Sequence, residues 1–140
     1  MSKATILIVE NEVIIAMDLA YKLEQLGYEI SGMTSYGEEA ITHAREQRPD
    51  LVLMDIRLAG KMDGVQAAEI ICSDISIPVV FLTANVGRAI QLQGKVAESF
   101  SFLLKPFNDR DLETHIEMAL SKQRVEQEQG SVHDARKPIG

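Results

Sequence analysis

Two kinds of segment alternate along the chain: short apolar runs, and longer stretches in which apolar residues recur at helical spacing. The short runs read ATILIV at 4–9, YEISGM at 28–33, LVLM at 51–54, PVVFL at 78–82 and FSFLL at 100–104. Nearly continuous apolar runs are typical of strands that helices cover on both faces. The second and fifth runs mix polar with apolar residues, so we expect these two strands at the edges of a sheet.

The longer stretches predict five helices. The first follows Asn11 and ends before Gly27, which lies where a C-terminal cap belongs. Its apolar stripe consists of Ile15, Leu19, Leu23 and Leu26. The others are expected at 38–47, ended by Pro49; at 65–72, entered through Asp63-Gly64; at 88–96, interrupted by Gly94; and after Asn108, with a stripe of Leu112, Ile116, Ala119 and Leu120.

The order of these elements is strand, helix, strand, helix throughout. Such an order predicts an α/β fold, with a parallel sheet, right-handed crossovers and helices on both faces. Ligands of such folds bind at the carboxyl ends of the strands, so functional residues are expected directly after each apolar run.

The length and the tail suggest one domain followed by an extension. At 140 residues the chain fits a single domain. Residues 121–129 (SKQRVEQEQ) are polar and could extend the last helix, whereas the sequence from Gly130 lacks periodicity. We therefore predict a domain over 1–122 and, over 123–140, a polar helical extension and a linker or disordered tail. Whether this tail leads to another domain or is simply solvated stays open.

Charge and composition narrow the function. The formal net charge of −7 argues against binding to nucleic acid or to an anionic membrane surface. No apolar run approaches the roughly 20 residues that span a bilayer, and the start of the chain lacks a signal-peptide pattern. The single cysteine, Cys72, permits no internal disulfide, and the cytoplasm is the expected location.

Polar residues follow four of the predicted strands. These are Glu10-Asn11, Asp55, Thr83-Ala84 and Lys105-Pro106. The inferred fold brings them to one edge of the sheet, where crowded carboxylates would need a cation to neutralise them. Oxygen ligands of this kind suit Mg²⁺, and a carboxylate beside Mg²⁺, Lys and Thr suits phosphoryl transfer.

The segments that contain these residues resemble those of a known family. The segments ILIVENE, DLVLMDIRL, MDG, PVVFLTA and FLLKPF, in this order, resemble those of the response-regulator receiver domain of two-component signal transduction, over roughly residues 3–122. The resemblance implies a doubly wound, five-stranded, flavodoxin-like fold. It also implies that a histidine kinase or phosphotransfer protein donates a phosphoryl group to an aspartate, and that the domain is a signalling switch rather than a general enzyme.

The resemblance also implies roles for individual residues. Asp55 matches the phosphoacceptor, and Lys105 matches the lysine that pairs with the phosphoryl group. The resemblance also implies that the Lys105-Pro106 peptide bond is cis. Thr83 matches the hydroxyl that bonds a phosphoryl oxygen, and Ala84 the small neighbour that leaves the site open. Phe102 matches the rotating switch residue. The Mg²⁺ (or Mn²⁺) ligands would be Glu10, Asn11, Asp55 and the backbone carbonyl of Arg57.

Two positions depart from the family pattern. Asn11 stands where the family has an acidic metal ligand, so we predict weaker Mg²⁺ binding and slower phosphorylation. The loop over 58–64 is one residue longer than the common form. Asn11 could equally cap the first helix, and Phe102 could be a core aromatic rather than a switch.

An α/β domain with these residues can serve three functions. The phosphorylation switch leads. A receiver-like interaction module that needs no phosphorylation is supported only by Asn11. A hydrolase with an aspartyl-phosphate intermediate typically has a second Asp two positions after the nucleophile, where this chain has Arg57; the chain also lacks GxxxxGK[ST], and GxGxxG after the first strand. Beyond these, an output domain after Gly140 and a homodimer through the fourth helix, fifth strand and fifth helix are expectations from the resemblance.

Overall fold

The computed structural model of the chain describes residues 3–84, 87 and 101–136. Five parallel strands form one sheet: β1 (Thr5–Val9), β2 (Glu29–Thr34), β3 (Leu51–Asp55), β4 (Val79–Thr83) and β5 (Ser101–Leu104). Their order across the sheet is β2-β1-β3-β4-β5. The doubly wound α/β prediction is therefore confirmed, and so is the placement of the two mixed strands, β2 and β5, at the edges.

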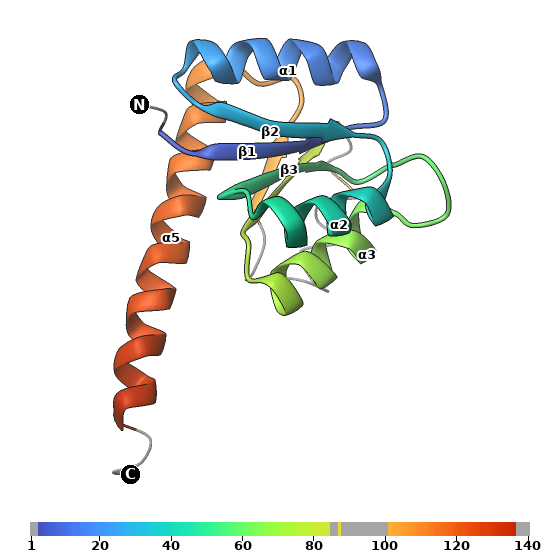
Figure 1. The fold of residues 1–140 in the computed structure, drawn as a ribbon. Helices are drawn as coiled ribbons and strands as arrows, with labels where there is room; N and C mark the ends of the chain where they lie inside the picture. The colour runs from blue at the N-terminus through green and yellow to red at the C-terminus, as the bar shows by residue number, and fades with distance from the viewer. Residues whose placement is uncertain (1–2, 85–86, 88–100, 137–140) are drawn as a thin grey trace.

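The described helices are α1 (Val13–Gln25), α2 (Gly37–Gln47), α3 (Gly64–Ile70) and α5 (Asp109–Arg136), as Figure 1 shows. A π-helical turn, η1 (Ile71–Ile75), continues α3. The helix predicted at 88–96 lies outside the described residues. None of the helices within the described part of the chain has the length and apolar character needed to cross a membrane.

The predicted caps at Gly27 and Asn108 are confirmed, and the alternative that Asn11 caps the first helix is wrong. Gly27, with φ of +100°, follows the C-cap of α1, and Asn108 Oδ1 accepts the Asp111 N–H at 2.8 Å at the start of α5. Asn11 does not cap α1. The helix begins at Val13 with Glu12 as N-cap, and no side chain caps it.

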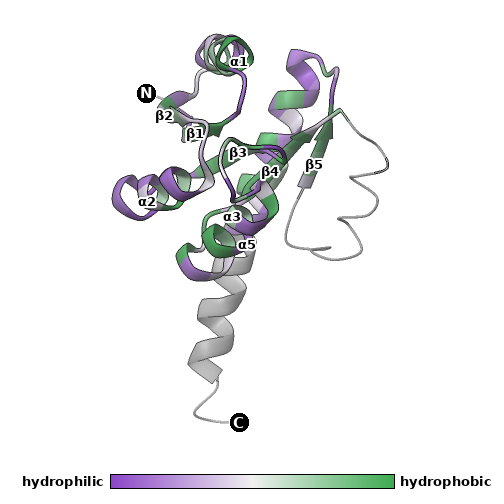
Figure 2. Cartoon of the chain, turned by 90° about the vertical axis from the view of Figure 1, so that its right-hand side faces the viewer, coloured by the Kyte–Doolittle hydropathy of each residue, from purple (hydrophilic) through white to green (hydrophobic). Residues whose placement is uncertain are grey.

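The sheet separates two apolar cores. In one, Leu7, Val52 and Phe81 pack with α2 and α3; in the other, Ile8, Leu53 and Leu82 pack with α1 and α5. Figure 2 shows the apolar strands between these helices. Covering both faces explains why β1, β3 and β4 are almost uniformly apolar in sequence.

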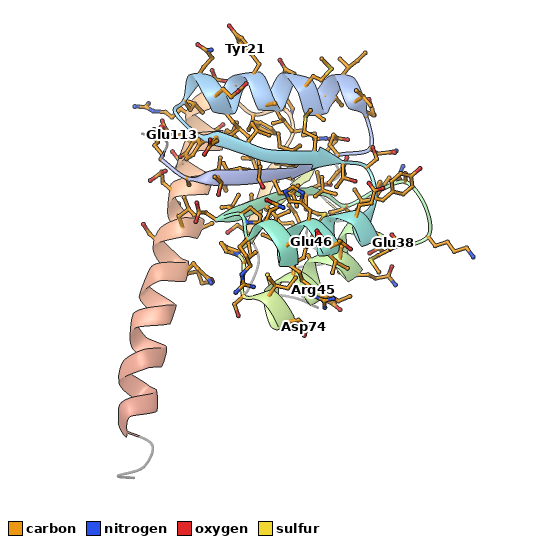
Figure 3. All side chains as sticks on the ribbon, viewed as in Figure 1. Tyr21, Glu38, Arg45, Glu46, Asp74 and Glu113 are labelled. Atoms are coloured by element: carbon orange, nitrogen blue, oxygen red, sulfur yellow. The ribbon has the colours of Figure 1, made fainter. Side chains whose placement is uncertain are left out.

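Polar contacts at the surface tie helices to their neighbours. Arg45 on α2 and Asp74 on η1 lie 3.9 Å apart, and Figure 3 shows the two side chains at adjacent positions. Tyr28, which directly precedes β2, is buried and donates its hydroxyl to Glu117 on α5. Burial, and then this hydrogen bond to Glu117, raise the pKa of Tyr28. Lys3 pairs with Glu113 on α5 and lies 5.2 Å from the centre of the Tyr28 ring.

Candidate functional site

The carboxyl ends of the strands surround an open cleft of about 1400 Å³. It lies where the predicted site was expected, because parallel strands end at the same edge of a sheet. The loops after β1, β3, β4 and β5 contribute its lining, which includes Asn11, Glu12, Asp55, Arg57, Lys61, Asp63, Thr83, Ala84 and Lys105.

Two carboxylates and one ammonium group meet at this cleft: Asp55 and Lys105 line it, and Glu10 is buried beside them. Lys105 Nζ lies 3.3 Å from Glu10 Oε1 and 3.8 Å from Asp55 Oδ2. The side chain of Glu10 is only 1% exposed, that of Asp55 18% and that of Lys105 24%. Asp55 is therefore the more accessible of the two carboxylates, and Lys105 lies near both.

The surroundings of Asp55 favour its protonated form. The pKa of Asp55 is raised from 3.8 to about 6, first by burial and then by the neighbouring Glu10, through a hydrogen bond and its charge. Lys105 and the backbone N–H of Arg57 act in the opposite direction. A cation bound beside Asp55 and Glu10 would relieve the repulsion between the two carboxylates.

The local backbone holds Asp55 at the end of β3. Its Oδ1 accepts the Arg57 N–H at 3.2 Å, and the Gly64 N–H donates to the Ile56 carbonyl at 2.8 Å. A Cβ on Gly64 would lie 2.2 Å from the Asp55 carbonyl oxygen, so only glycine fits where α3 meets the strand. Asp63 caps α3 in a reciprocal pair with Gln66.

Of the remaining predicted residues, Thr83, Ala84 and Asn11 line the cleft and Phe102 does not. Thr83 ends β4 and is 6% exposed, and its carbonyl accepts the Lys105 N–H at 2.8 Å. Ala84 and Asn11 are exposed in the cleft lining. Phe102 is half-buried on β5, and its ring stacks on that of Phe81 with centroids 5.3 Å apart. The Lys105-Pro106 bond is cis, as predicted.

The donor set at the cleft suits a hard cation, with one charge fewer than the family pattern. Across the described ranges, no three His, Cys, Asp or Glu side chains are placed to hold a metal ion. Glu10 and Asp55 offer two carboxylates, close enough for Glu10 to raise the pKa of Asp55, and the Asn11 amide and the Arg57 carbonyl offer uncharged oxygens. Oxygen ligands of this kind fit Mg²⁺, which needs few protein carboxylates.

Sequence reasoning missed the residues that contact the loops of the site without lining the cleft. Ser35 contacts the backbone of Glu10 and of Ala59, and Tyr36 forms a parallel bridge with Ala59. No sequence signal could have found them, because these contacts use backbone groups and short polar side chains in a connection. The capping pair of Asp63 and Gln66 was readable, because a cap residue followed three positions later by Gln is a helix-start pattern.

Comparison with known proteins identifies the same type of domain. Residues 6–117 match the family described as "Response regulator receiver domain". The transcriptional regulatory protein PdtaR of Mycobacterium tuberculosis is 41% identical over 119 residues, which cover 85% of this chain and 58% of PdtaR. The phyllosphere-induced regulator PhyR of Methylorubrum extorquens is 37% identical over 116 residues, covering 82% of this chain and 43% of PhyR. The chain thus spans about half the length of these relatives.

Solved structures agree with this result. The signal receiver domain of a modulated diguanylate cyclase from Desulfovibrio desulfuricans superposes with a TM-score of 0.80 at 36% identity, covering 88% of this chain and 98% of that one. The response regulator PhyR from Brucella abortus also gives a TM-score of 0.80, at 33% identity, covering 95% of this chain and 54% of that one.

Proposed function

The chain belongs to the response-regulator receiver domain family, and on this premise we propose that it is a signalling switch that accepts a phosphoryl group on Asp55. Receiver domains of this family are typically signalling modules rather than enzymes. The observation that carries the proposal is the position of Lys105, whose ammonium group lies within 4 Å of both Glu10 and Asp55 at an open cleft.

The chemistry proposed at Asp55 is nucleophilic. One carboxylate oxygen of Asp55 forms a bond to phosphorus while the P–N bond of a partner's phosphohistidine breaks. The electron pair of that bond stays on the imidazole nitrogen, and the product is an aspartyl phosphate. Lys105 would pair with the new phosphoryl oxygens, and the open cleft at Ala84 leaves room for them.

We propose that Glu10, Asn11, Asp55 and the Arg57 carbonyl hold the Mg²⁺ (or Mn²⁺) on which the family usually depends. The ion, when bound, supplies positive charge that lowers the repulsion between the carboxylates and the incoming phosphoryl group. Because Asn11 brings no charge, we expect weaker cation binding than with an acid at that position.

The signal would leave the site through Thr83 and Phe102. Thr83 ends β4 and lines the cleft, and its hydroxyl would donate a hydrogen bond to a phosphoryl oxygen. Phe102 on the neighbouring strand would then turn inward from its half-buried position against Phe81. The changed outer surface beside β5 and α5 would be read by a partner.

A mass measurement tests the central step. Incubation with Mg²⁺ and acetyl phosphate should add the mass of one phosphoryl group to the wild-type chain, with acetate as the leaving group. Asp55→Asn should gain no mass, whereas Asp63→Asn, altered elsewhere in the cleft lining, should still gain it. Equal labelling of Asp55→Asn would contradict the proposal.

The partners follow from the family. A histidine kinase or phosphotransfer protein would supply the phosphoryl group, and the cytoplasm, where response regulators generally work, would be the location. Because PdtaR and PhyR are about twice as long as the matched region, an output domain beyond Gly140 is also proposed. The domain boundary near residue 122 stays a prediction.

We also propose a homodimer through the face of the fourth helix, β5 and α5. The fourth helix lies outside the described residues, whereas α5 continues to Arg136, well past the body of the domain (Figure 1). If the extension contributes to the dimer, truncation after Leu120 should lower the sedimentation coefficient by more than the shorter chain alone would. Unchanged self-association would contradict that contribution.

One observation favours a second candidate function. Asn11 removes a charge from the cation site, which would suit an interaction module that works without phosphorylation. A partner-binding measurement on Asp55→Ala separates the two candidates. If the domain is a switch, this variant should lose the phosphorylation-dependent binding of its partner. If it is an interaction module, the variant should bind the partner as well as the wild type does.

A further inference from the structure

Ser35, in the connection between β2 and α2, contacts both loops that carry the predicted cation ligands. Its hydroxyl donates to the backbone carbonyl of Glu10 at 3.3 Å, and its own carbonyl accepts the N–H of Ala59 at 2.9 Å. Ser35 is half-buried and is not part of the described lining of the cleft. It therefore cannot act on a ligand directly and can influence the site only through the backbone.

The neighbours of Ser35 strengthen the same connection. The Thr34 carbonyl accepts the Glu10 N–H at 3.0 Å, so the β2–α2 connection holds the Glu10 backbone at both its N–H and its carbonyl. Tyr36 pairs with Ala59, and a Cβ on Gly60 would lie 3.2 Å from the Tyr36 ring. Gly60 has φ of +81°, a conformation that glycine adopts without strain.

We propose that Ser35 is a positioning residue for the cation site, a role that rests on the function proposed above. By joining the Glu10 carbonyl to the β3–α3 loop, Ser35 sets the separation between the Glu10-Asn11 turn and the Asp55–Arg57 segment. Mg²⁺ requires nearly ideal octahedral geometry, so a small change in this separation alters affinity. Groups that orient ligands without touching the metal commonly affect metal binding.

The matched variants are Ser35→Ala and Ser31→Ala. Both serines are half-buried on or next to β2, and the Ser31 hydroxyl lies 2.6 Å from His43 Nε2, away from the cleft. Mg²⁺ binding is measured by titration of backbone amide NMR shifts, without any phosphodonor. We expect Ser35→Ala to raise the Kd for Mg²⁺ roughly fivefold, as suits the loss of one hydrogen bond outside the ligand shell. Ser31→Ala should leave that Kd unchanged.

A second pair of variants protects the test against misfolding. Ser35→Thr and Ser35→Val have nearly the same shape and differ in the hydroxyl. Thr should bind Mg²⁺ with nearly wild-type affinity, and Val should bind as weakly as Ala. The phosphorylation rate of Ser35→Val should approach that of Ser35→Thr at saturating Mg²⁺, because the hydroxyl acts on affinity rather than on the nucleophile.

The outcomes distinguish this proposal from the proposed function. If the wild type binds Mg²⁺ and accepts a phosphoryl group, and Ser35→Ala and Ser35→Val bind Mg²⁺ equally well, the role of Ser35 is wrong and the function stands. If Ser31→Ala weakens Mg²⁺ binding as much as Ser35→Ala, the effect is a general loss of stability and the role is again wrong. If the wild type neither binds Mg²⁺ nor is phosphorylated, both proposals fail.

Discussion

Gly64 lies so close to Asp55 that a Cβ at position 64 would be 2.2 Å from the Asp55 carbonyl oxygen. Backbone atoms at this distance cannot give way as a flexible side chain can. We predict that Gly64→Ala lowers the free energy of unfolding by about 3 kcal/mol, because α3 must move away from the end of β3. Urea denaturation followed by circular dichroism measures this loss.

Gly32 provides the control for this substitution. A Cβ on Gly32 would lie 2.7 Å from the His43 ring, a side chain that can rotate. Gly32→Ala should therefore cost less than Gly64→Ala, roughly 1 kcal/mol. If the two substitutions cost the same, contact with the Asp55 backbone does not set the requirement for glycine at position 64.

Lys105 counteracts the rise in the pKa of Asp55, because its ammonium group lies 3.8 Å from the carboxylate. We predict that Lys105→Met raises the pKa of Asp55 above its value of about 6 in the folded chain. A ¹³C NMR titration of the Asp55 carboxyl carbon in EDTA measures it. Lys61→Met, which removes a cation from the cleft lining without an ion pair to Asp55 among the described contacts, should change this pKa less.

The sequence predicts those features of the fold and of the site that depend on burial or on neighbouring residues, and it does not predict those that depend on contacts between distant residues. The edge positions of two strands could be predicted: β2 and β5 mix polar and apolar residues because each has a neighbouring strand on one side only. Gly27 and Asn108 were found because their conformation or side chain has a local role. Such features are encoded within a few residues of the position they affect.

Other features depend on contacts that local patterns do not encode. Asn11 has a good capping side chain, yet α1 begins beyond it at Val13, because the turn after β1 extends through Glu12. The helix predicted at 65–72 changes to a π-helical turn at Ile71, since apolar spacing does not distinguish the two helix types. Ser35 gave no signal because its partners, Glu10 and Ala59, are distant in sequence and are contacted through their backbone.

Asn11 contributes an uncharged amide to the lining of the cleft. We predict that Asn11→Asp tightens Mg²⁺ binding about tenfold, because a carboxylate replaces an uncharged amide as ligand. NMR titration with Mg²⁺ measures this change. Glu12→Gln, which removes an exposed charge from the adjacent position in the cleft lining, serves as the control and should weaken binding by a smaller factor. Equal Mg²⁺ affinity of Asn11→Asp and the wild type would mean that position 11 is not a ligand.

The charge on Asp55 should make the cation-free domain less stable at neutral pH. Its pKa is raised from 3.8 to about 6, so the folded chain binds this proton more tightly than the unfolded chain. The stability from that proton is fully present below pH 3.8 and is lost as the pH rises through about 6. Asp55→Asn, which keeps the shape and removes the charge, should therefore be more stable than the wild type in EDTA at pH 7.5, by roughly 2 kcal/mol.

This stability difference should shrink as the pH falls from 7.5 toward 4, because the wild-type carboxyl then becomes protonated in the folded chain. Urea denaturation of both proteins across this range measures it. Asp18→Asn, on the exposed surface of α1 beside Lys22, controls for the change in net charge and should shift stability by less than about 0.5 kcal/mol. If Asp55→Asn is no more stable than the wild type at pH 7.5, burial and Glu10 do not disfavour the Asp55 carboxylate. The two carboxylates would then have no repulsion for a bound cation to relieve.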